Sequence, residues 1–305
     1  MQVPEIVIPP ALRQNRLRNN GEVAQAWLDS LPALAQRVAE DWGLTIEAPF
    51  PDLSYNYVTR VRRADGSPAV LKLCLPDTDM RLEAAALAGF DGRGCVRLLQ
   101  SDLDAGVLLL ELVQPGTPVW HLGDDSAEIG AAAALMRELW RRPPQDNVFP
   151  HALDWVHEAL MPDAIRETKL ANPWLEPALR TVAERADPRG DVLLHGDLHH
   201  NNILASAEDA WVAIDPKGVV GDRAWELAPF IFNRLGIIHE ADWLRAARRG
   251  ADQFAEELSL ERESVYAWSA VRSIQSAFWS LRDYADASTL FRAAVICAEE
   301  LAKGP

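Results

Sequence analysis

Cysteine and lysine are both scarce in this sequence of 305 residues. The three cysteines, Cys74, Cys95 and Cys297, are scattered and lack the spacing of a metal site or a disulfide framework. The sequence opens without the basic residues and apolar core of a secretory signal, and no apolar run approaches the length of a membrane span. These absences favour a reducing, cytoplasmic location and argue against insertion in a membrane.

Positive charge is also in deficit, with 30 lysines and arginines against 45 acidic residues and a formal net charge of −15. Such a charge argues against nucleic acid and anionic membranes as partners, and it is compatible with a cationic small molecule. The apolar content of 49% is that of an ordinary globular protein, and the length suits two lobes. Both a monomer and a homodimer are compatible with the sequence.

Polar residues follow a short apolar strand abruptly in the region 192–215. After Val192-Leu193-Leu194 the sequence reads His195-Gly196-Asp197-Leu198-His199-His200-Asn201-Asn202. The apolar pair Ile203-Leu204 follows, and after a hairpin-like break over residues 206–209 another short strand ends at Ile214-Asp215. Two strands joined by a tight turn would bring Asp197, Asn202 and Asp215 to one end of a small ribbon. The alternative is a polar turn between strands with a buried histidine.

This set of side chains suits phosphoryl transfer. The reaction needs a carboxylate to receive a hydroxyl proton and oxygen ligands for the Mg²⁺ that accompanies the nucleotide phosphates. Asp197 is the candidate base, and Asn202 and Asp215 are the candidate metal ligands. The order His-x-Asp-x-x-x-x-Asn followed by a strand-ending aspartate is similar to the catalytic and metal-binding loops of kinases.

The first part of the chain predicts a helical extension over residues 1–48 and a sheet over residues 49–113. Apolar positions at helical spacing predict a helix over residues 22–42, kinked or divided at Pro32, after an irregular start over residues 1–20. Residues 49–113 predict five strands with one helix, over residues 79–89, inserted after the third strand.

Lys72 stands inside an apolar strand, where an ammonium group is costly unless it is paired. Glu83, eleven residues later on the predicted helix, is the candidate partner. The alternative is a lysine that reaches solvent beside an ordinary helix carboxylate. No Gly-x-Gly-x-x-Gly is present. The residues that stand where a phosphate-covering loop belongs are Ser54, Tyr55 and Asn56.

The remainder, residues 114–305, predicts a second domain that is mainly helical. Pro115-Gly116-Thr117-Pro118 breaks the preceding pattern and marks the boundary. The predicted helices cover residues 127–140, 152–170, 174–186, 239–257, 260–283 and 285–302, with another opening after Gly221. A β-rich part followed by a helical part is an α+β arrangement.

The chain resembles the aminoglycoside/hydroxyurea antibiotic resistance kinases of the streptomycin 6-kinase type, within the protein-kinase-like superfamily. The resemblance covers residues 27–279 and rests on residues 53–58, 71–72, 91–94, 195–202, 214–218 and 221–222. It implies a bilobal protein-kinase-like fold and ATP- and Mg²⁺-dependent transfer of phosphate to a hydroxyl of a small molecule, either streptomycin or a related antibiotic.

The resemblance also implies roles for individual residues. Asp197 is carried over as base, Asn202 and Asp215 as metal ligands, and Lys72 with Glu83 as the phosphate clamp. The backbone of Glu111 and Val113 would meet adenine. Supporting roles fall on His195, Lys217 and Asp222, and Lys217 either meets the transferring phosphate or neutralises Asp222. An acceptor pocket would be lined by Glu226, Trp268, Gln275, Trp279 and Asp283, although most of the tryptophans are more simply explained as core residues.

Three other functions stay open at this point. The first is a kinase of an unrelated metabolite. The second is a metallohydrolase that uses His195, Asp197, His199, His200 and Asp215, but such an enzyme has no need of Lys72 paired with Glu83. The third is a pseudokinase or nucleotide-binding scaffold, against which the complete set of kinase residues speaks.

Overall fold

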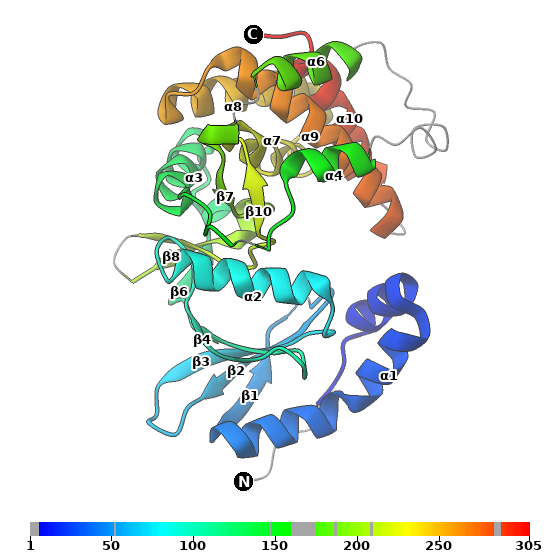
Figure 1. The fold of residues 1–305 in the computed structure, drawn as a ribbon, viewed down its shortest axis with the longest axis vertical. Coiled ribbons are helices and arrows are strands. Elements are labelled where there is room, and N and C mark those ends of the chain that lie inside the picture. The colour runs from blue at the N-terminus through cyan, green and yellow to red at the C-terminus, as the bar shows by residue number, and fades with distance from the viewer. Residues whose placement is uncertain are drawn as a thin grey trace. The chain divides into compact units, whose positions relative to one another are not determined.

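The computed structural model of the chain divides after Gln114 into two units, Met1–Gln114 and Pro115–Pro305. It describes residues 6–51, 53–146, 148–159, 175–185, 188–207, 210–283 and 288–305. The first unit holds a five-stranded sheet and the second is mainly helical (Figure 1). This composition confirms the α+β class predicted from the sequence.

Alternating burial builds the sheet of the first unit. In β2, Tyr57, Thr59 and Val61 are buried, whereas Arg60 and Arg62 are exposed, as the two-residue period of a strand requires. The strands are β1 (Thr45–Pro49), β2 (Tyr57–Arg62), β3 (Pro68–Leu73), β4 (Leu98–Asp102) and β5 (Val107–Glu111), in the antiparallel order β1-β2-β3-β5-β4. Helix α2 (Thr78–Phe90) follows the third strand, as predicted. Strand β1 is a correction, because the sequence assigned residues 45–48 to the helical extension.

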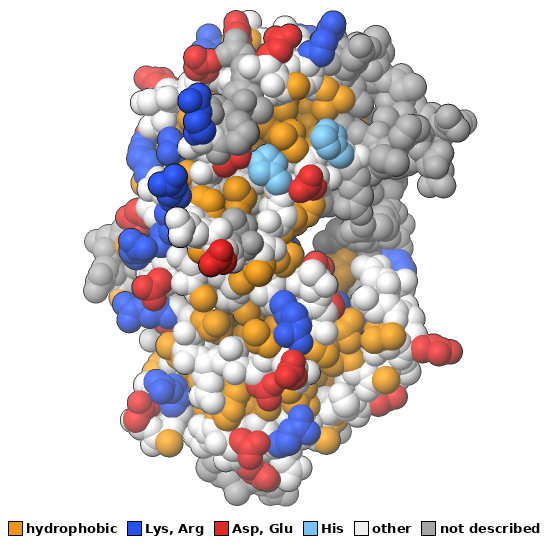
Figure 2. Space-filling model, viewed as in Figure 1, with side chains coloured by type: hydrophobic (Ala, Val, Ile, Leu, Met, Phe, Trp, Pro, Cys, Tyr) orange, Lys and Arg blue, Asp and Glu red, His pale blue; other side chains and the backbone are white. Residues whose placement is uncertain are grey.

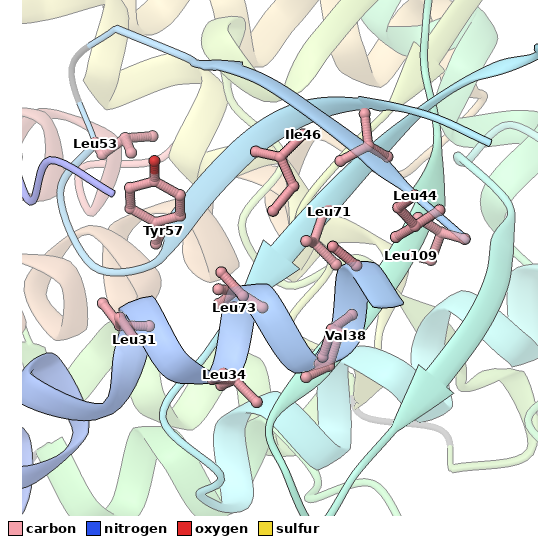
Figure 3. Packing of buried hydrophobic residues seen from close by; sticks show 14 of the residues in the cluster. Leu31, Leu34, Val38, Leu44, Ile46, Leu53, Tyr57, Leu71, Leu73 and Leu109 are labelled. Atoms are coloured by element: carbon pink, nitrogen blue, oxygen red, sulfur yellow. The ribbon is translucent and has the colours of Figure 1, made fainter. Parts of the chain in front are cut away.

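Helix α1 (Pro10–Trp42) packs its apolar stripe against this sheet. Leu31, Leu34 and Val38 belong to one buried cluster with residues of β1, β2, β3 and β5 (Figure 3). The irregular start predicted for residues 1–20 is wrong in part, since the helix begins at Pro10, where a proline loses no backbone hydrogen bond.

The interruption of α1 also differs from the prediction. The helix runs through Pro32 and breaks at Gly21, which has φ 51° and ψ −128°. Glycine adopts this conformation readily because it has no Cβ. Residues 10–20 therefore form a first segment that can turn away from the direction of the second.

Helices fill most of the second unit. The Asp124 carboxylate accepts a hydrogen bond of 2.8 Å from the Ala127 N–H and caps α3, the helix that the sequence predicted over residues 127–140. The helices are α3 (Asp125–Leu139), α4 (Ala152–Ala159), α6 (Leu175–Arg185), α7 (Ala228–Leu235), α8 (Trp243–Leu258), α9 (Arg262–Asp283) and α10 (Ser288–Leu301), with 3-10 turns η1 (Val119–Leu122), η2 (Pro188–Gly190), η4 (Arg223–Leu227) and η5 (Glu240–Asp242). Residues 160–170 of the helix predicted over 152–170 lie outside the described part of the chain. Helix α9 packs against α6, α7 and α10.

Two small sheets carry the polar region of the second unit. Strand β7 (Val192–Leu194) pairs with β10 (Val219–Gly221), and β8 (Ile203–Ser206) pairs with β9 (Trp211–Ala213). The turn η3 (His200–Asn202) lies between β7 and β8. The segment Pro115–Pro118, predicted only as a break, is strand β6 and pairs with β8.

The charged side chains, the cysteines and the described helices can be compared with what the composition predicted. On the face drawn in Figure 2, acidic and basic side chains are interspersed. All three cysteines are buried thiols. Among the described helices, none combines the length and the apolar character needed to cross a membrane.

Candidate active site

Two segments of the second unit, residues 195–202 and 214–217, are tied together through their backbones. Asp197 and Asn202 belong to the first segment and Asp215 to the second. The hydrogen bonds run from Ile214 N–H to Asn202 O at 3.0 Å, from Lys217 N–H to His195 O at 2.7 Å and, within the first segment, from Asn202 Nδ2 to Asp197 O at 2.9 Å. The structure thus places the three acidic and amide side chains on one joined pair of turns.

His195 is fully buried and holds both turns through its ring. Its Nε2 lies 2.8 Å from the Ile214 carbonyl oxygen, which can only accept, and its Nδ1 lies 3.3 Å from the Asp197 N–H, which can only donate. These partners require the neutral ring with its proton on Nε2. Burial lowers the pKa of His195 to about 4, which agrees with a neutral, positioning side chain.

Gly196 allows the two turns to approach each other. Its φ is +87°, and a Cβ added there would lie 3.1 Å from the Lys217 Cβ and 3.3 Å from Val219 Cγ1. Any larger residue would therefore be strained and would push the 214–217 turn away.

Asp215 and Asn202 have the donor chemistry of a magnesium site. Asp215 has a φ of 61°, a left-handed conformation that aspartate tolerates better than most residues. The amide nitrogen of Asn202 is directed at the Asp197 carbonyl, so its Oδ1 is on the opposite side of the amide. One carboxylate and one amide oxygen fit the few protein ligands that Mg²⁺ takes, while water and phosphate supply the rest.

The side chains of His199 and His200 do not converge on a common point where a metal could bind. His199 Nε2 lies 4.0 Å from Asp197 Oδ2, but His200 points elsewhere: its ring stacks on Phe230 at 3.8 Å and lies 3.4 Å from Glu128 Oε2. Burial lowers the pKa of His200 to about 3. In the described ranges, no group of three or more His, Cys, Asp or Glu side chains could hold a metal ion. The metallohydrolase reading has no support in this arrangement.

Glu226 contacts the backbone of the 195–202 segment, and this position differs from the predicted one. The sequence assigned it to an acceptor pocket, but it is fully buried and accepts hydrogen bonds from the backbone N–H groups of His195 at 2.6 Å and Gly196 at 2.9 Å. Burial raises the pKa of Glu226 to about 7, against the lowering effect of these two donors. Its carboxylate supports the turn before Asp197.

Arg272 of α9 completes this support. Its guanidinium lies 4.4 Å from the centre of the Trp225 ring, donates to the Gly196 carbonyl oxygen at 3.2 Å and to Ser276 Oγ at 2.5 Å. Burial lowers the pKa of Arg272 to about 10, and the charges of Asp197 and Glu226 oppose that shift. The arginine therefore remains a cation at neutral pH.

The other residues predicted to line an acceptor pocket are buried or lie outside the described side chains. Trp268 and Gln275 have exposures of 1% and 0%. Neither polar atom of the Gln275 amide has a hydrogen-bond partner in the described part of the chain. The predictions for Trp279 and Asp283 fall on the end of α9, whose side chains are outside the described set.

Asp222 and Lys217 lie on either side of β10. Asp222 accepts a hydrogen bond of 2.8 Å from the Ala224 N–H and thereby caps η4, and burial raises its pKa. Lys217 is exposed. No ion pair joins it to Asp222 among the described residues, so neutralisation of Asp222 has no support in the structure.

In the first unit, Lys72 of β3 is paired with Glu83 of α2. The two atoms Lys72 Nζ and Glu83 Oε1 are 2.6 Å apart, and the side chains are only 3% and 10% exposed. The register of β3 between β2 and β5 and the N-cap of α2 by Asp77 fix the two backbones. This geometry excludes the alternative of a lysine that reaches solvent alone.

The segment 54–56 is held by the first segment of α1. Arg16 Nε donates to the Tyr55 carbonyl oxygen at 2.5 Å, its second amino group donates to Asn56 Oδ1 at 2.8 Å, and Asn15 Nδ2 donates to the Ser54 carbonyl oxygen at 3.1 Å. The sequence named the three loop residues but gave no partner for them.

Glu111 and Val113 lie at the end of the first unit. Glu111 ends β5, its N–H donates to the Arg97 carbonyl oxygen at 3.0 Å, and its carboxylate accepts from the Arg97 N–H at 3.3 Å. Val113 follows as a half-buried residue.

Sequence reasoning missed Arg16 and Arg272. A local signal existed for Arg272, since an arginine four residues after Trp268 stands on the apolar face of a helix and must find a buried partner. For Arg16 the sequence showed only a short basic patch, which is typical of a solvated surface.

Comparison with known proteins identifies the family. The family model described as aminoglycoside/hydroxyurea antibiotic resistance kinase matches residues 42–284. The chain is 32% identical to the streptomycin 6-kinase of Streptomyces glaucescens over 97% of each chain. It is 35% identical to the hydroxyurea phosphotransferase of Kitasatospora aureofaciens over 91% of this chain and 81% of that protein.

A solved structure supports the fold. A choline kinase from Streptococcus pneumoniae superposes with a TM-score of 0.64 at 13% identity, over 90% of this chain and 99% of the other. At that identity the likeness concerns the kinase-like fold alone. From the family match and the two sequence relatives, the chain belongs to the aminoglycoside/hydroxyurea antibiotic resistance kinase family and is a small-molecule kinase.

Proposed function

We propose that this kinase transfers the γ-phosphate of ATP to a hydroxyl of streptomycin or a related aminoglycoside. The observation that carries the proposal is the similarity to a streptomycin 6-kinase along almost the whole of both chains. The acidic surface expected from the net charge of −15 suits a cationic acceptor.

Asp197 is the proposed base. Its side chain is 35% exposed, so an acceptor can reach it, and the backbone on both sides of Gly196 is held by buried groups. The acceptor hydroxyl hydrogen-bonds this carboxylate and passes its proton to it as the oxygen attacks phosphorus. The bond from phosphorus to the leaving oxygen of ADP breaks in the same in-line displacement.

Asn202 and Asp215 are the residues proposed to hold Mg²⁺. A magnesium ion held there would stabilise negative charge on the β- and γ-phosphates. Lys217 is exposed two residues beyond Asp215, and we propose it as a cation for the transferring phosphate. Normal turnover in Lys217→Ala would remove that role.

The first unit supplies the proposed nucleotide contacts. Lys72, oriented by Glu83, neutralises the α- and β-phosphates, and residues 54–56 contact the phosphates in place of a glycine-rich loop. The backbone carbonyl of Glu111 and the backbone amide of Val113 meet adenine. Trp268 and Gln275 are buried, so they are proposed to shape the acceptor side of the second unit from within, while Glu226 is proposed as a support of the loop.

A second acceptor, hydroxyurea, is favoured by one observation. The hydroxyurea phosphotransferase is 35% identical, slightly more than the streptomycin kinase. Both acceptors present a hydroxyl, so the chemistry at Asp197 is the same. We expect the enzyme to work in the cytoplasm, where ATP is available and its three buried thiols stay reduced, as a monomer or a homodimer.

The test is ATP consumption with mass spectrometry of the products, across aminoglycosides, hydroxyurea and cellular metabolites that carry hydroxyls. A mass gain of one phosphate on streptomycin supports the proposal. Turnover only with hydroxyurea selects the second acceptor, and turnover only with a metabolite keeps the kinase chemistry but removes the antibiotic. ATP binding without any phosphorylated product would point to a scaffold.

A further inference from the structure

The first segment of α1, residues 10–20, contacts the segment 54–56, whereas the later part of the helix packs on the sheet. Arg16 projects from it and is only 10% exposed as a side chain. The guanidinium lies 5.5 Å from the centre of the Trp27 ring and 5.7 Å from that of Tyr55, and 3.7 Å from an Asp77 oxygen. Two aromatic faces and a carboxylate therefore hold one cation beside the segment 54–56.

The contacts of this cation determine how the segment presents its backbone. In a planar trans peptide the C=O and the following N–H point in opposite directions. The carbonyls of Ser54 and Tyr55 are directed at Asn15 and Arg16 of α1. The N–H groups of Tyr55 and Asn56 consequently point away from α1.

The Asn56 amide is oriented by the same arginine. A guanidinium can only donate, so the atom of Asn56 that meets Arg16 at 2.8 Å is the oxygen. The NH₂ end is then directed away from the arginine. The backbone N–H of Asn56 and its side-chain NH₂ are thus both directed away from α1, and such N–H donors are the chemistry that binds an anion.

We propose that Arg16 is a positioning residue that fixes residues 54–56 as an anion-binding loop for the nucleotide phosphates. The inference rests on the proposed function, in which this segment replaces a glycine-rich loop. A glycine-rich loop presents its N–H groups because it lacks side chains. Here the carbonyls are tied back by the helical extension, and Gly21 provides the break that lets the first segment of α1 reach them.

Arg16 also connects the loop to the lysine clamp. Asp77, its ion-pair partner at 3.7 Å, is the N-cap of α2 and accepts from the Met80 N–H at 3.0 Å. Helix α2 carries Glu83, which holds Lys72. One guanidinium thus contacts both elements that are proposed to meet the phosphates.

The experiment measures ADP binding by calorimetry and steady-state kinetics in wild type, Arg16→Gln and the matched control Arg13→Gln. Arg13 lies on the same segment, and within the described part of the chain its side chain makes no hydrogen bond or ion pair with residues 54–56. For Arg16→Gln we expect the Kd for ADP and the KM for ATP to rise about tenfold, the order expected for lost charge-assisted hydrogen bonds. The KM for the acceptor should stay within about twofold of wild type.

A second measurement separates positioning from a merely structural role. Hydrogen exchange of the 53–57 amides should accelerate in Arg16→Gln and stay unchanged in Arg13→Gln. Should Arg16→Gln fail to fold, Asn15→Ala releases only the Ser54 carbonyl and should weaken ADP binding in the same direction by a smaller factor.

The outcomes are distinct. A lower melting temperature in Arg16→Gln with unchanged ADP affinity and unchanged exchange overturns the inference and leaves the kinase function intact. An equal loss of ADP affinity in Arg13→Gln also overturns it, because charge alone would then explain the effect. Absence of ADP binding in wild type overturns the proposed function first, and the inference with it.

Discussion

The guanidinium of Arg272 donates a 3.2 Å hydrogen bond to the carbonyl oxygen of Gly196, although the two residues are 76 positions apart. The N–H of the same glycine donates to Glu226. A buried cation and a buried carboxyl group therefore hold opposite polar groups of one residue. Asp197 is the next residue along, so its backbone position depends on both.

Removing Arg272 should destabilise the fold because the buried Glu226 then loses its compensating cation. We expect Arg272→Met to lower the free energy of unfolding by about 3 kcal/mol, because the hydrogen bonds of the guanidinium to Gly196 and Ser276 are lost together with its electrostatic attraction to Glu226. The double variant Arg272→Met with Glu226→Gln should recover part of this loss. Urea denaturation of the wild type, the two single variants and the double variant measures these free energies of unfolding. Strictly additive losses would show that the two side chains act independently.

Asp197→Ala should lower turnover about 10²–10⁴-fold, the usual contribution of general-base assistance. The ADP Kd should stay within about twofold, because the carboxylate is proposed to act on the acceptor and not on the nucleotide. Single-turnover kinetics and calorimetry give the two values. Near-normal turnover in this variant would refute the assignment of the base.

The Lys72–Glu83 pair allows stability and activity to be separated. Lys72→Met leaves the buried carboxylate without its partner at 2.6 Å and should cost about 3–5 kcal/mol of stability. Adding Glu83→Gln should restore most of the stability, since a neutral amide is less costly to bury.

The same double variant should keep a raised KM for ATP, because no ammonium group meets the phosphates. Chemical denaturation and initial-rate kinetics on one preparation test both halves. Recovery of ATP use together with stability would mean that Lys72 has only a structural role.

Acid should weaken the fold through His195. Its folded pKa is about 4 and its ordinary value is 6.5, so below pH 6.5 the unfolded state binds a proton that the folded state does not. The contribution of His195 to the free energy of unfolding is complete above pH 6.5 and is lost as pH falls through about 4. At 1.36 kcal/mol per pKa unit, the full effect is roughly 3 kcal/mol.

His195→Asn removes this titration and should flatten the acid side of the stability profile. Urea unfolding of both proteins between pH 4 and pH 7.5 gives the difference. A variant whose stability falls as steeply as that of wild type would show that His195 does not titrate in this window.

Local patterns in the sequence were enough for the α+β class and for the polar turns. A strand that ends in an aspartate can be predicted from a few neighbouring residues, because polar residues end strands. A lysine inside an apolar run likewise predicts a nearby partner, because burial of an ammonium group is costly without one. The same reasoning failed at the start of α1. Residues 10–20 lack the apolar spacing of the later helix, and contacts with residues 54–56 stabilise them instead.

Only the tertiary structure decided which buried charges hold the candidate catalytic loop and the candidate phosphate loop. The sequence assigned Glu226 to a pocket and did not single out Arg272, because periodicity tells which side of a helix is buried but not which group it meets. The contacts of Arg16 with residues 54–56 span about forty positions. Such pairings depend on how separate elements pack, and the free energy that selects them comes from the whole core and not from the residues that touch.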